Sequence, residues 1–327
     1  MSRLLADRPC PIEAHPVYRR VDYRVPTPAI NQFHQLIQRC LRFRIPGAII
    51  YGRPRFGKSS AIDFLQHYLQ ANGLKLPLLR LDVHAKKIPS EFAFFGNLLA
   101  AAGHPSLSAR ESSQLRRRLA AKLRELAEVA GEDRIVLFTD EAQDLSRLEL
   151  EWLRDIHNAM AKHSILFTAL LVGSHELRAK KSILQSEHAQ QIVARFMREE
   201  LPFHGLRNAS DCATVLKGYD VSTYPQASEW TYTRFFLPRA WGAGLRLVDQ
   251  ADALWDSFVD AHRRARLPGD PEVGMEFFTS AVEYALAESG AADDKTYAFA
   301  ESLWRAAVDN SGYVRSLDDG DAQISVA

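Results

Sequence analysis

Short apolar runs alternate with amphipathic segments over the first two thirds of the chain. The runs are apolar at consecutive positions, which is typical of strands buried on both faces of a parallel sheet. Between them, apolar residues spaced three and four apart predict helices. The predicted strands are residues 47–51, 78–83, 134–139, 164–172 and 200–203, and the predicted helices are residues 29–43, 61–70, 90–101, 108–128, 149–162 and 176–190. This alternation predicts an α/β fold, a parallel sheet flanked by helices.

The strand signals fade after Leu206, where the remaining apolar patterns are helical. They cover residues 210–218, 229–236, 245–266, 272–288 and 300–308. We therefore expect an α/β domain over residues 29–208, followed by a small all-helical lid and C-terminal helices over residues 209–310. Residues 1–28 hold five prolines and little periodicity, which predicts an extended arm. The acidic residues 311–327 predict a flexible tail.

Composition narrows the class of protein. Of the 327 residues, 46% are hydrophobic and 25% are charged, a balance that excludes wholesale disorder. No apolar run approaches the length of about 18 residues that a membrane span needs, and the amino end lacks the apolar core of a signal peptide. We therefore expect a cytoplasmic protein with no membrane partner. Three separated cysteines and scattered histidines predict neither a disulfide framework nor a metal cage built by the protein.

The charges are unevenly distributed although the net charge is only +1. Residues 1–60 carry eleven basic and three acidic residues, whereas residues 268–327 carry three basic and twelve acidic residues. This asymmetry predicts a basic surface for an anionic partner and an acidic tail that faces something else. The alternative interpretation is two ordinary solvated surfaces.

The segment from Gly52 to Ser59, GRPRFGKS, matches the pattern GxxxxGK[ST] between a predicted strand and a predicted helix. Glycines let backbone N–H groups surround phosphate oxygens, and the start of a helix adds partial positive charge. We expect Lys58 to reach the β and γ phosphates of ATP and the Ser59 hydroxyl to bind Mg²⁺. Gly52, Gly57 and Ser60 complete the predicted nucleotide-binding set. The alternative is a glycine turn that carries a surface lysine.

Two acids follow the apolar strand RIVLFT about eighty residues after this loop. A buried strand can fix Asp140 beside the Mg²⁺ ion, and the next residue, Glu141, can then orient or activate the attacking water. This arrangement predicts a Walker B site, with Asp140 as a metal and nucleotide residue and Glu141 as the catalytic base. A solvated turn is the alternative.

The next predicted strand ends in the polar residues Ser174 and His175. Either side chain can lie beside the γ phosphate as the polar group called sensor 1, and we favour Ser174. Arg195 follows a helical segment and precedes the last strand of the sheet, which predicts an arginine finger that neutralises transition-state charge in a neighbouring subunit. A surface ion pair with Glu199 or Glu200 is the alternative for Arg195.

Arg246 lies in the predicted first turn of a helix in the lid, after two glycines. A cation at the start of a helix is unfavourable for the helix dipole. A role toward phosphate, as the residue called sensor 2, therefore competes with an ordinary exposed arginine.

These residues together resemble a known family. The P-loop, TDEAQDL at 139–145, VGSHEL at 172–177, ARF at 194–196 and GLR at 244–246 are similar to the AAA+ ATPases of DNA transposition, the TnsC and TniB group, and more distantly to MuB and IstB. The resemblance implies an AAA+ P-loop fold with a helical lid. It also implies an ATP-dependent regulator that oligomerises on target double-stranded DNA as a ring or helical filament and recruits or activates a transposase, with slow hydrolysis driving disassembly.

The chain departs from this family in two places. The loop interior, RPRF, is bulkier and more basic than usual, and Ser59 replaces the common threonine. Both changes are compatible with nucleotide binding, because the backbone surrounds the phosphates and serine supplies the same hydroxyl. We match neither the amino arm nor the acidic tail to a partner-binding signature.

Candidate DNA contacts lie in and after the loop that follows the second predicted strand. The loop holds Lys86 and Lys87, and the long helix predicted at 108–128 carries Arg116 and Arg117. In a ring or filament these cations can neutralise DNA phosphates in a central channel. A solvated helix face with accompanying acids is the alternative.

We expect double-stranded DNA, a transposase, a target-selection protein and further copies of the chain as partners. Two other functions compete with this prediction. One is an AAA+ helicase loader or remodelling ATPase that acts on a protein partner. The other is a P-loop small-molecule kinase, which needs an acceptor pocket and no arginine from a second subunit.

Overall fold

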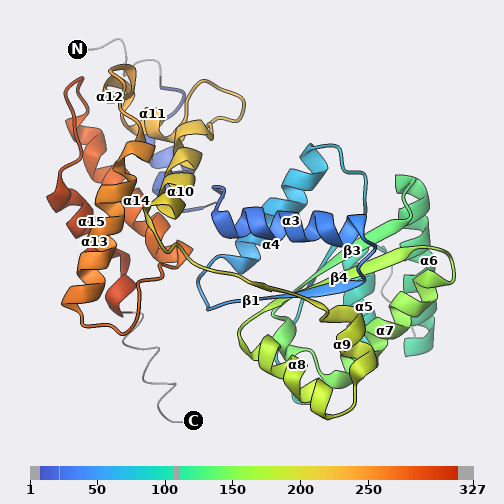
Figure 1. Cartoon of the computed structure of the whole chain (residues 1–327). Helices are drawn as coiled ribbons and strands as arrows, with labels where there is room; N and C mark the ends of the chain where they lie inside the picture. Colours follow the sequence, from blue (N-terminus) through green and yellow to red (C-terminus); the bar gives the residue numbers. More distant parts are fainter. Residues whose placement is uncertain (1–7, 22, 106–110, 316–327) are drawn as a thin grey trace. The chain divides into compact units, whose positions relative to one another are not determined.

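A computed structural model describes residues 8–21, 23–105 and 111–315. The contacts between its Cα atoms divide these residues into two compact units (Figure 1). Gln32–Pro54 and Lys58–Phe203 form the sheet unit. The helical unit consists of the described residues before Gln32, the short piece Arg55–Gly57, and the described residues from His204 onward. In the described part of the chain, no helix is both long enough and apolar enough to cross a lipid bilayer.

Five parallel strands make the sheet, in the order β2-β3-β4-β1-β5. They are β1 Gly47–Tyr51, β2 Leu78–Asp82, β3 Arg134–Asp140, β4 Leu166–Gly173 and β5 Glu199–Pro202. In register, Asp82 is opposite Asp140 and Tyr51 is opposite Gly173. The carboxyl ends of these four strands therefore meet at one edge, where ligands bind in open α/β sheets.

Helices cover both faces of this sheet (Figure 1). They are α3 Pro28–Arg42, α4 Lys58–Ala71, α5 Glu91–Ala101, α6 Ser112–Ala130, α7 Arg147–Ala161, α8 Glu176–Ser186 and α9 Gln190–Phe196, with the 3-10 turn η2 Ala142–Asp144 after β3. Strand β3 explains the continuous apolar pattern. Its Phe138 ring meets Phe33 of α3, whereas Ile135 and Leu137 belong to the core cluster of Phe95 and its neighbours. Both faces of the strand are buried, as the pattern predicts.

The helical unit has a core of large aromatic side chains. Its elements are η1 Ile12–Ala14, α2 Pro16–Arg19, α10 Ala209–Val221, α11 Tyr232–Phe236, α12 Pro238–Gly242, η3 Leu247–Gln250, α13 Ala251–Arg264, α14 Met275–Ser289, η4 Gly290–Ala292 and α15 Glu301–Ser311. Tyr219, Phe235, Phe258, Phe278 and Trp304 are fully enclosed. The predicted helices of this region therefore form one core of their own.

Two predicted helices differ from the structure for local reasons. The helix expected at 176–190 ends earlier, at Ser186, and α9 follows it, because His188 has a left-handed backbone with φ +59°. The helix expected at 245–266 begins later, at Ala251, after the separate turn η3. The buried carboxylate of Asp220 accepts hydrogen bonds from the backbone N–H groups of Leu247 and Val248, at 3.0 and 2.9 Å, and so holds η3 apart from α13.

The expectation of an extended arm over residues 1–28 differs most from the structure. Described residues of this segment form η1 and α2 and enter the core of the helical unit, where Val17 is buried. His15 is fully buried among the rings of Tyr232, Phe235 and Phe236, whose centroids lie 4.3–5.2 Å from its own. Burial, aided by the charge of Arg8, lowers the pKa of His15 to about 4. A segment this short shows too few turns for helical periodicity to appear in the sequence.

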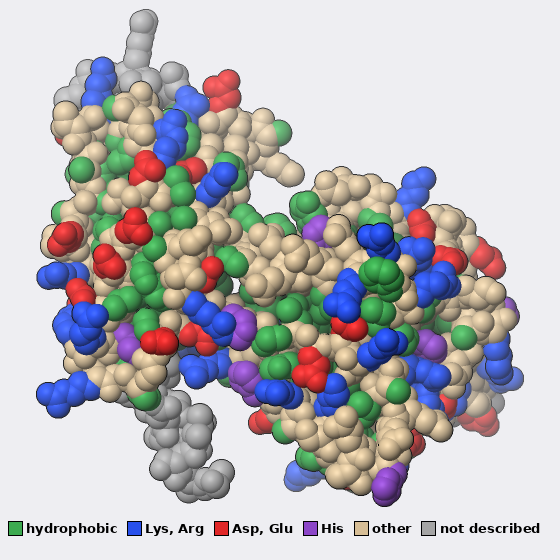
Figure 2. Space-filling model, in the orientation of Figure 1, with side chains coloured by type: hydrophobic (Ala, Val, Ile, Leu, Met, Phe, Trp, Pro, Cys, Tyr) green, Lys and Arg blue, Asp and Glu red, His purple; other side chains and the backbone are tan. Residues whose placement is uncertain are grey.

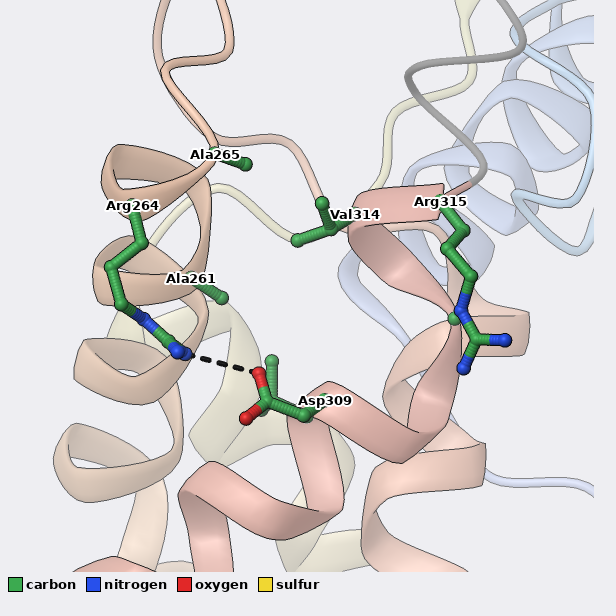
Figure 3. A pocket seen from close by; sticks show the side chains of 8 residues that line it. Ala261, Arg264, Ala265, Asp309, Val314 and Arg315 are labelled. Carbon is green, nitrogen blue, oxygen red and sulfur yellow. Dashed lines mark hydrogen bonds and ion pairs between the residues drawn. The ribbon is translucent and has the colours of Figure 1, made fainter.

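The predicted acidic tail at 311–327 lies mostly outside the described residues. Up to Arg315 the chain is still packed, since Tyr313 is buried and its hydroxyl lies 2.9 Å from Nδ1 of His262. A pocket of about 270 Å³ lies beside this end of the chain, where Arg264 forms an ion pair of 3.0 Å with Asp309 (Figure 3). None of the predicted site residues lines it.

The three cysteines are free and differ in burial. Cys40 of α3 and Cys212 of α10 are fully buried, and Cys10 is half-buried. Burial raises the pKa of the Cys40 thiol to about 11 and also raises that of Cys212. The two buried thiols therefore contribute to packing, and their raised pKa values disfavour the reactive thiolate.

Candidate nucleotide-binding site

The P-loop connects β1 to α4, so the N-terminus of α4 faces the loop. A Cβ atom on Gly52 would lie 2.2 Å from the carbonyl oxygen of Phe203, and Gly57 has φ +90°, so both positions require glycine. Lys58 is 8% exposed, and its Nζ donates to the carbonyl oxygens of Gly52 and Arg53 at 3.0 and 2.9 Å. Burial lowers the pKa of Lys58, and the nearby charges of Glu141 and Asp140 oppose this. The predicted lysine and acid pair thus lie close together.

Ser59 and Asp140 are in direct contact. The Ser59 hydroxyl hydrogen-bonds to the Asp140 carboxylate, and Oδ1 of this carboxylate also accepts from the backbone N–H of Glu141 at 3.0 Å. Burial raises the pKa of Asp140, which the hydrogen bond from Ser59 and the charge of Arg80 oppose. A serine hydroxyl and a carboxylate from two elements are the oxygen ligands that Mg²⁺ prefers. These two residues therefore fit the predicted magnesium site.

Glu141 takes an uncommon backbone conformation. Its φ of +51° and ψ of +40° are left-handed, directly before η2. A left-handed residue other than glycine costs of order 1–3 kcal/mol and is found preferentially at functional sites. The Glu141 carboxylate is exposed and accepts a hydrogen bond of 2.6 Å from Nε2 of Gln143. The Glu141 carboxylate thus lies at the carboxyl edge of the sheet, where we expect the catalytic base.

Ser174 follows β4, which lies between β3 and β1 in the sheet. Its backbone N–H donates to Oε1 of Gln143 at 3.0 Å, and its hydroxyl oxygen accepts from the N–H of Glu176 at 3.3 Å. The alternative residue, His175, packs against the ring of Tyr51 at 5.6 Å. The two sensor candidates remain predictions, although both lie at the same edge as the P-loop and the acid pair.

Arg80 of β2 is a site residue that the sequence analysis missed. Its three nitrogens each meet a different carboxylate: Nε lies 2.7 Å from Asp82, Nη2 lies 3.0 Å from Asp140, and Nη1 meets Asp63 of α4. A signal was present, because a charged residue in the middle of a predicted buried strand needs a partner. Arg80 therefore connects the P-loop helix to Asp140.

Arg195 lies near the end of α9, and its Nη1 donates to Oδ1 of Asn158 at 2.7 Å. The two acids of the alternative interpretation have other partners among the described residues. Glu199 forms an ion pair with Arg39 at 3.5 Å, and Glu200 forms one with Lys181. The guanidinium of Arg195 is thus held by a neutral amide, and its role as an arginine finger remains a prediction.

Arg246 belongs to the helical unit. Its guanidinium stacks 3.7 Å from the centre of the Trp241 ring and donates to the carbonyl oxygens of Trp241 and Leu245 at 3.1 and 2.7 Å. It precedes η3 rather than standing in the first turn of a long helix. Its predicted role toward the nucleotide remains a prediction.

The four predicted DNA-binding residues separate into two kinds. Lys86 forms an ion pair with the buried carboxylate of Glu149, and Arg116 pairs with Glu91 and Asp155 at 2.6 and 3.3 Å. Both cations are therefore paired with acids of the same chain. Lys87 and Arg117 are exposed and form no ion pair with the described residues, which makes them the better candidates. On the face shown in Figure 2, basic and acidic side chains are interspersed over both units.

Known proteins resemble this chain in fold. Residues 46–180 match the model of the AAA domain family. The ORC2 protein of Aeropyrum pernix in ADPNP–ADP complexes is 15% identical, with a TM-score of 0.52 over 91% of this chain and 71% of that chain. The ADP form of the same protein is 16% identical, with a TM-score of 0.55 over 91% and 72%. Among curated proteins, no sequence matches this chain.

A third structure, the Aeropyrum pernix ORC1 protein in complex with DNA, is 13% identical with a TM-score of 0.49; the match covers 86% of this chain and 64% of that chain, less than two thirds of its length. At these identities, the similarity to ORC2 establishes the fold, a P-loop sheet followed by a helical region. The comparison does not separate the transposition group from other AAA+ proteins. Residues 46–180 match the AAA domain family, the chain has an AAA+ P-loop fold, and it is an ATPase.

Proposed function

We propose that this ATPase is a nucleotide-controlled DNA-binding switch. Copies of the chain assemble on double-stranded DNA when ATP is bound, and slow hydrolysis releases them. Lys58 and Ser60 hold the phosphates, Ser59 and Asp140 hold Mg²⁺, and Glu141 activates water. In this proposal the neighbouring copy completes each site.

The position of Arg195 carries the proposal. Phe196, its neighbour, lies against the start of β1: a Cβ atom on Gly47 would lie 2.8 Å from the Phe196 Cα. The P-loop begins at Gly52, five residues after Gly47, which corresponds to about 16 Å along an extended strand. An arginine side chain is too short to cover that distance. This distance supports the proposal that Arg195 acts on the nucleotide of another copy and not on that of its own chain.

This geometry favours an assembling switch over a small-molecule kinase. A kinase transfers phosphate to an acceptor bound in its own chain and needs no arginine from a second copy. An arginine finger supplied by a neighbour is worth about 10³–10⁵ in hydrolysis rate. Hydrolysis thereby becomes dependent on assembly, which is the property that a DNA-bound switch requires.

A mixing experiment tests the shared site. Arg195→Ala should bind ATP normally and hydrolyse it at least about a thousandfold more slowly. Mixing it with Glu141→Ala should restore part of the activity, because an Arg195→Ala copy still supplies Glu141 to a site that its neighbour completes. Arg198→Ala, an exposed arginine three residues further on, is the control and should remain active. Two inactive variants that stay inactive when mixed would count against the shared site.

The finer proposal is a role in DNA transposition, with a transposase and a target-selection protein as partners. It is supported by the family resemblance of the motifs and by the exposed cations Lys87 and Arg117. Electron microscopy of the protein with duplex DNA and ATP, ADP or a nonhydrolysable analogue tests assembly on DNA. Co-sedimentation with an integrase-type transposase from a neighbouring gene then tests recruitment. Binding of a helicase ring in place of the transposase would favour the loader function.

A further inference from the structure

Gln143 connects two strands at the edge where the candidate catalytic residues lie. Its Nε2 donates to Oε2 of Glu141 at 2.6 Å, and its Oε1 accepts from the backbone N–H of Ser174 at 3.0 Å. Glu141 follows β3 and Ser174 follows β4. One side chain thus joins the candidate base to the end of the neighbouring strand.

The chemistry of the partners fixes the orientation of this amide. A carboxylate only accepts hydrogen bonds, and a backbone N–H only donates them. Rotating the amide by 180° would place its oxygen against the Glu141 carboxylate and its NH₂ group against the Ser174 N–H. Both contacts would then be repulsive, so the link between Glu141 and Ser174 forms in one orientation only.

The surroundings of Gln143 are shaped for this contact. A Cβ atom on Gly173 would lie 2.3 Å from Oε1 of Gln143, so a larger residue there would displace the amide. The ammonium of Lys180 donates to the main-chain carbonyl oxygens of Gln143 and Leu145. The backbone of the turn is therefore held from α8, and the side chain is held from β4.

We propose that Gln143 is a positioning residue that holds the Glu141 carboxylate in place for hydrolysis from the end of β4. The inference rests on the proposed role of Glu141 as the base. The exposed Glu141 side chain has several rotamers available, and the hydrogen bond from Nε2 selects one of them. Because the same amide also accepts from the Ser174 N–H, a displacement of Ser174 would also displace the hydrogen bond to Glu141.

Two variants break the link from opposite sides. Gln143→Leu removes both hydrogen bonds, and Gly173→Ala pushes the amide away while leaving Glu141 and Gln143 unchanged. Each should lower kcat about tenfold to hundredfold, because a misplaced base reacts poorly, while KM and the affinity for ADP change less than about twofold. Gln185→Leu makes the same chemical change at an exposed position of α8 and should leave kcat unchanged.

A double-mutant cycle separates positioning from a structural effect. In a Glu141→Ala background, Gln143→Leu should cause no further loss in single-turnover hydrolysis, because the base on which it acts is gone. An equal loss in both backgrounds, or a normal kcat in Gln143→Leu and Gly173→Ala, would overturn the inference while the role of Glu141 stands. A normal kcat in Glu141→Ala alone would overturn the proposed base and the inference with it.

Discussion

The helical unit and the sheet unit bury their charged side chains in different ways. In the helical unit, the buried carboxylate of Asp220 accepts from the Thr233 hydroxyl at 2.6 Å and from two backbone N–H groups of η3. In the sheet unit, the buried ammonium of Lys58 meets only two carbonyl oxygens of its own loop in the described structure. The charge of Asp220 is thus compensated by hydrogen bonds from the protein. Among the described residues, no carboxylate contacts the Lys58 ammonium directly.

This difference distinguishes a structural charge from a binding charge. A buried charge is costly unless opposite charges or several hydrogen bonds compensate it. The hydrogen bonds of Asp220 offset this cost and connect α10 to α11 and η3. Lys58 lies at the N-terminus of α4, where we expect phosphate to bind. We therefore expect mutations of the two residues to affect different properties.

Replacing Lys58 should have the largest effect on binding. Lys58→Met should weaken ATP affinity about a hundredfold to ten-thousandfold, because hydrogen bonds to charged groups contribute about 1.5–3 kcal/mol each and we expect Lys58 to contact two phosphates. Its melting temperature should remain the same or rise, since a buried charge is removed. Titration with a fluorescent ATP analogue and thermal unfolding measure both quantities. Lys87→Met is the control, and a stability loss with normal affinity would reverse the assignment.

Replacing Asp220 should mainly reduce stability. Asp220→Ala leaves two backbone N–H groups and the Thr233 hydroxyl without their acceptor, which should cost about 3–5 kcal/mol of unfolding free energy. Urea unfolding followed by circular dichroism measures this loss. The exposed Asp256→Ala should cost less than about 0.5 kcal/mol. Similar losses in the two variants would contradict the structural role of Asp220.

His15 should make the stability of the helical unit depend on pH. Its pKa is about 4 in the folded chain against an ordinary 6.5. Between these values the unfolded chain binds a proton that the folded chain does not, so stability rises with pH. Acidification from about pH 6.5 to pH 4 should therefore remove up to about 3 kcal/mol. His15→Asn keeps an acceptor for the Val17 N–H, which now donates to Nδ1 of His15 at 3.2 Å. This variant should show a weaker dependence of stability on pH. Equal dependence in the variant and the unchanged protein would contradict the role of His15.

Replacing Arg80 should have the smallest effect, confined to the metal. Arg80→Met removes the side chain that fixes Asp140 relative to Asp63 and Asp82, so the Asp140 carboxylate should be less well placed for Mg²⁺. We expect the Mg²⁺ concentration for half-maximal hydrolysis to rise about tenfold, equivalent to about 1.4 kcal/mol. The control is Arg44→Met, which breaks an exposed ion pair of 2.7 Å with Asp133. A lower melting temperature with normal Mg²⁺ dependence would make Arg80 purely structural.

The sheet unit was predictable because its signals are local. Each strand is a continuous apolar run. The P-loop and the acid pair of this unit directly follow predicted strands, so the sequence already places both at the carboxyl edge of the sheet. The residues missed there act across strands. Arg80 meets Asp63 and Asp140, which are 17 and 60 residues away in sequence. Nothing in the sequence shows which carboxylates share one guanidinium.

The helical unit was harder to predict because its contacts are long-range. His15 and Val17 are buried by rings that lie about 200 residues later, and Tyr23 hydrogen-bonds to Tyr219 at 3.0 Å and to Glu283. Prolines and low periodicity indicate an extended segment only while these partners are unknown. The amino-terminal prediction therefore differed from the structure, whereas α10, α11, α13, α14 and α15 correspond to helices predicted after Leu206.

The unequal burial of the three cysteines has a practical consequence. Cys40 and Cys212 are enclosed, and their raised pKa values keep them as thiols at neutral pH, where the thiolate is the reactive form. Cys10 is half-buried. A maleimide dye should therefore label the natural sequence at one position, with no cysteine replaced.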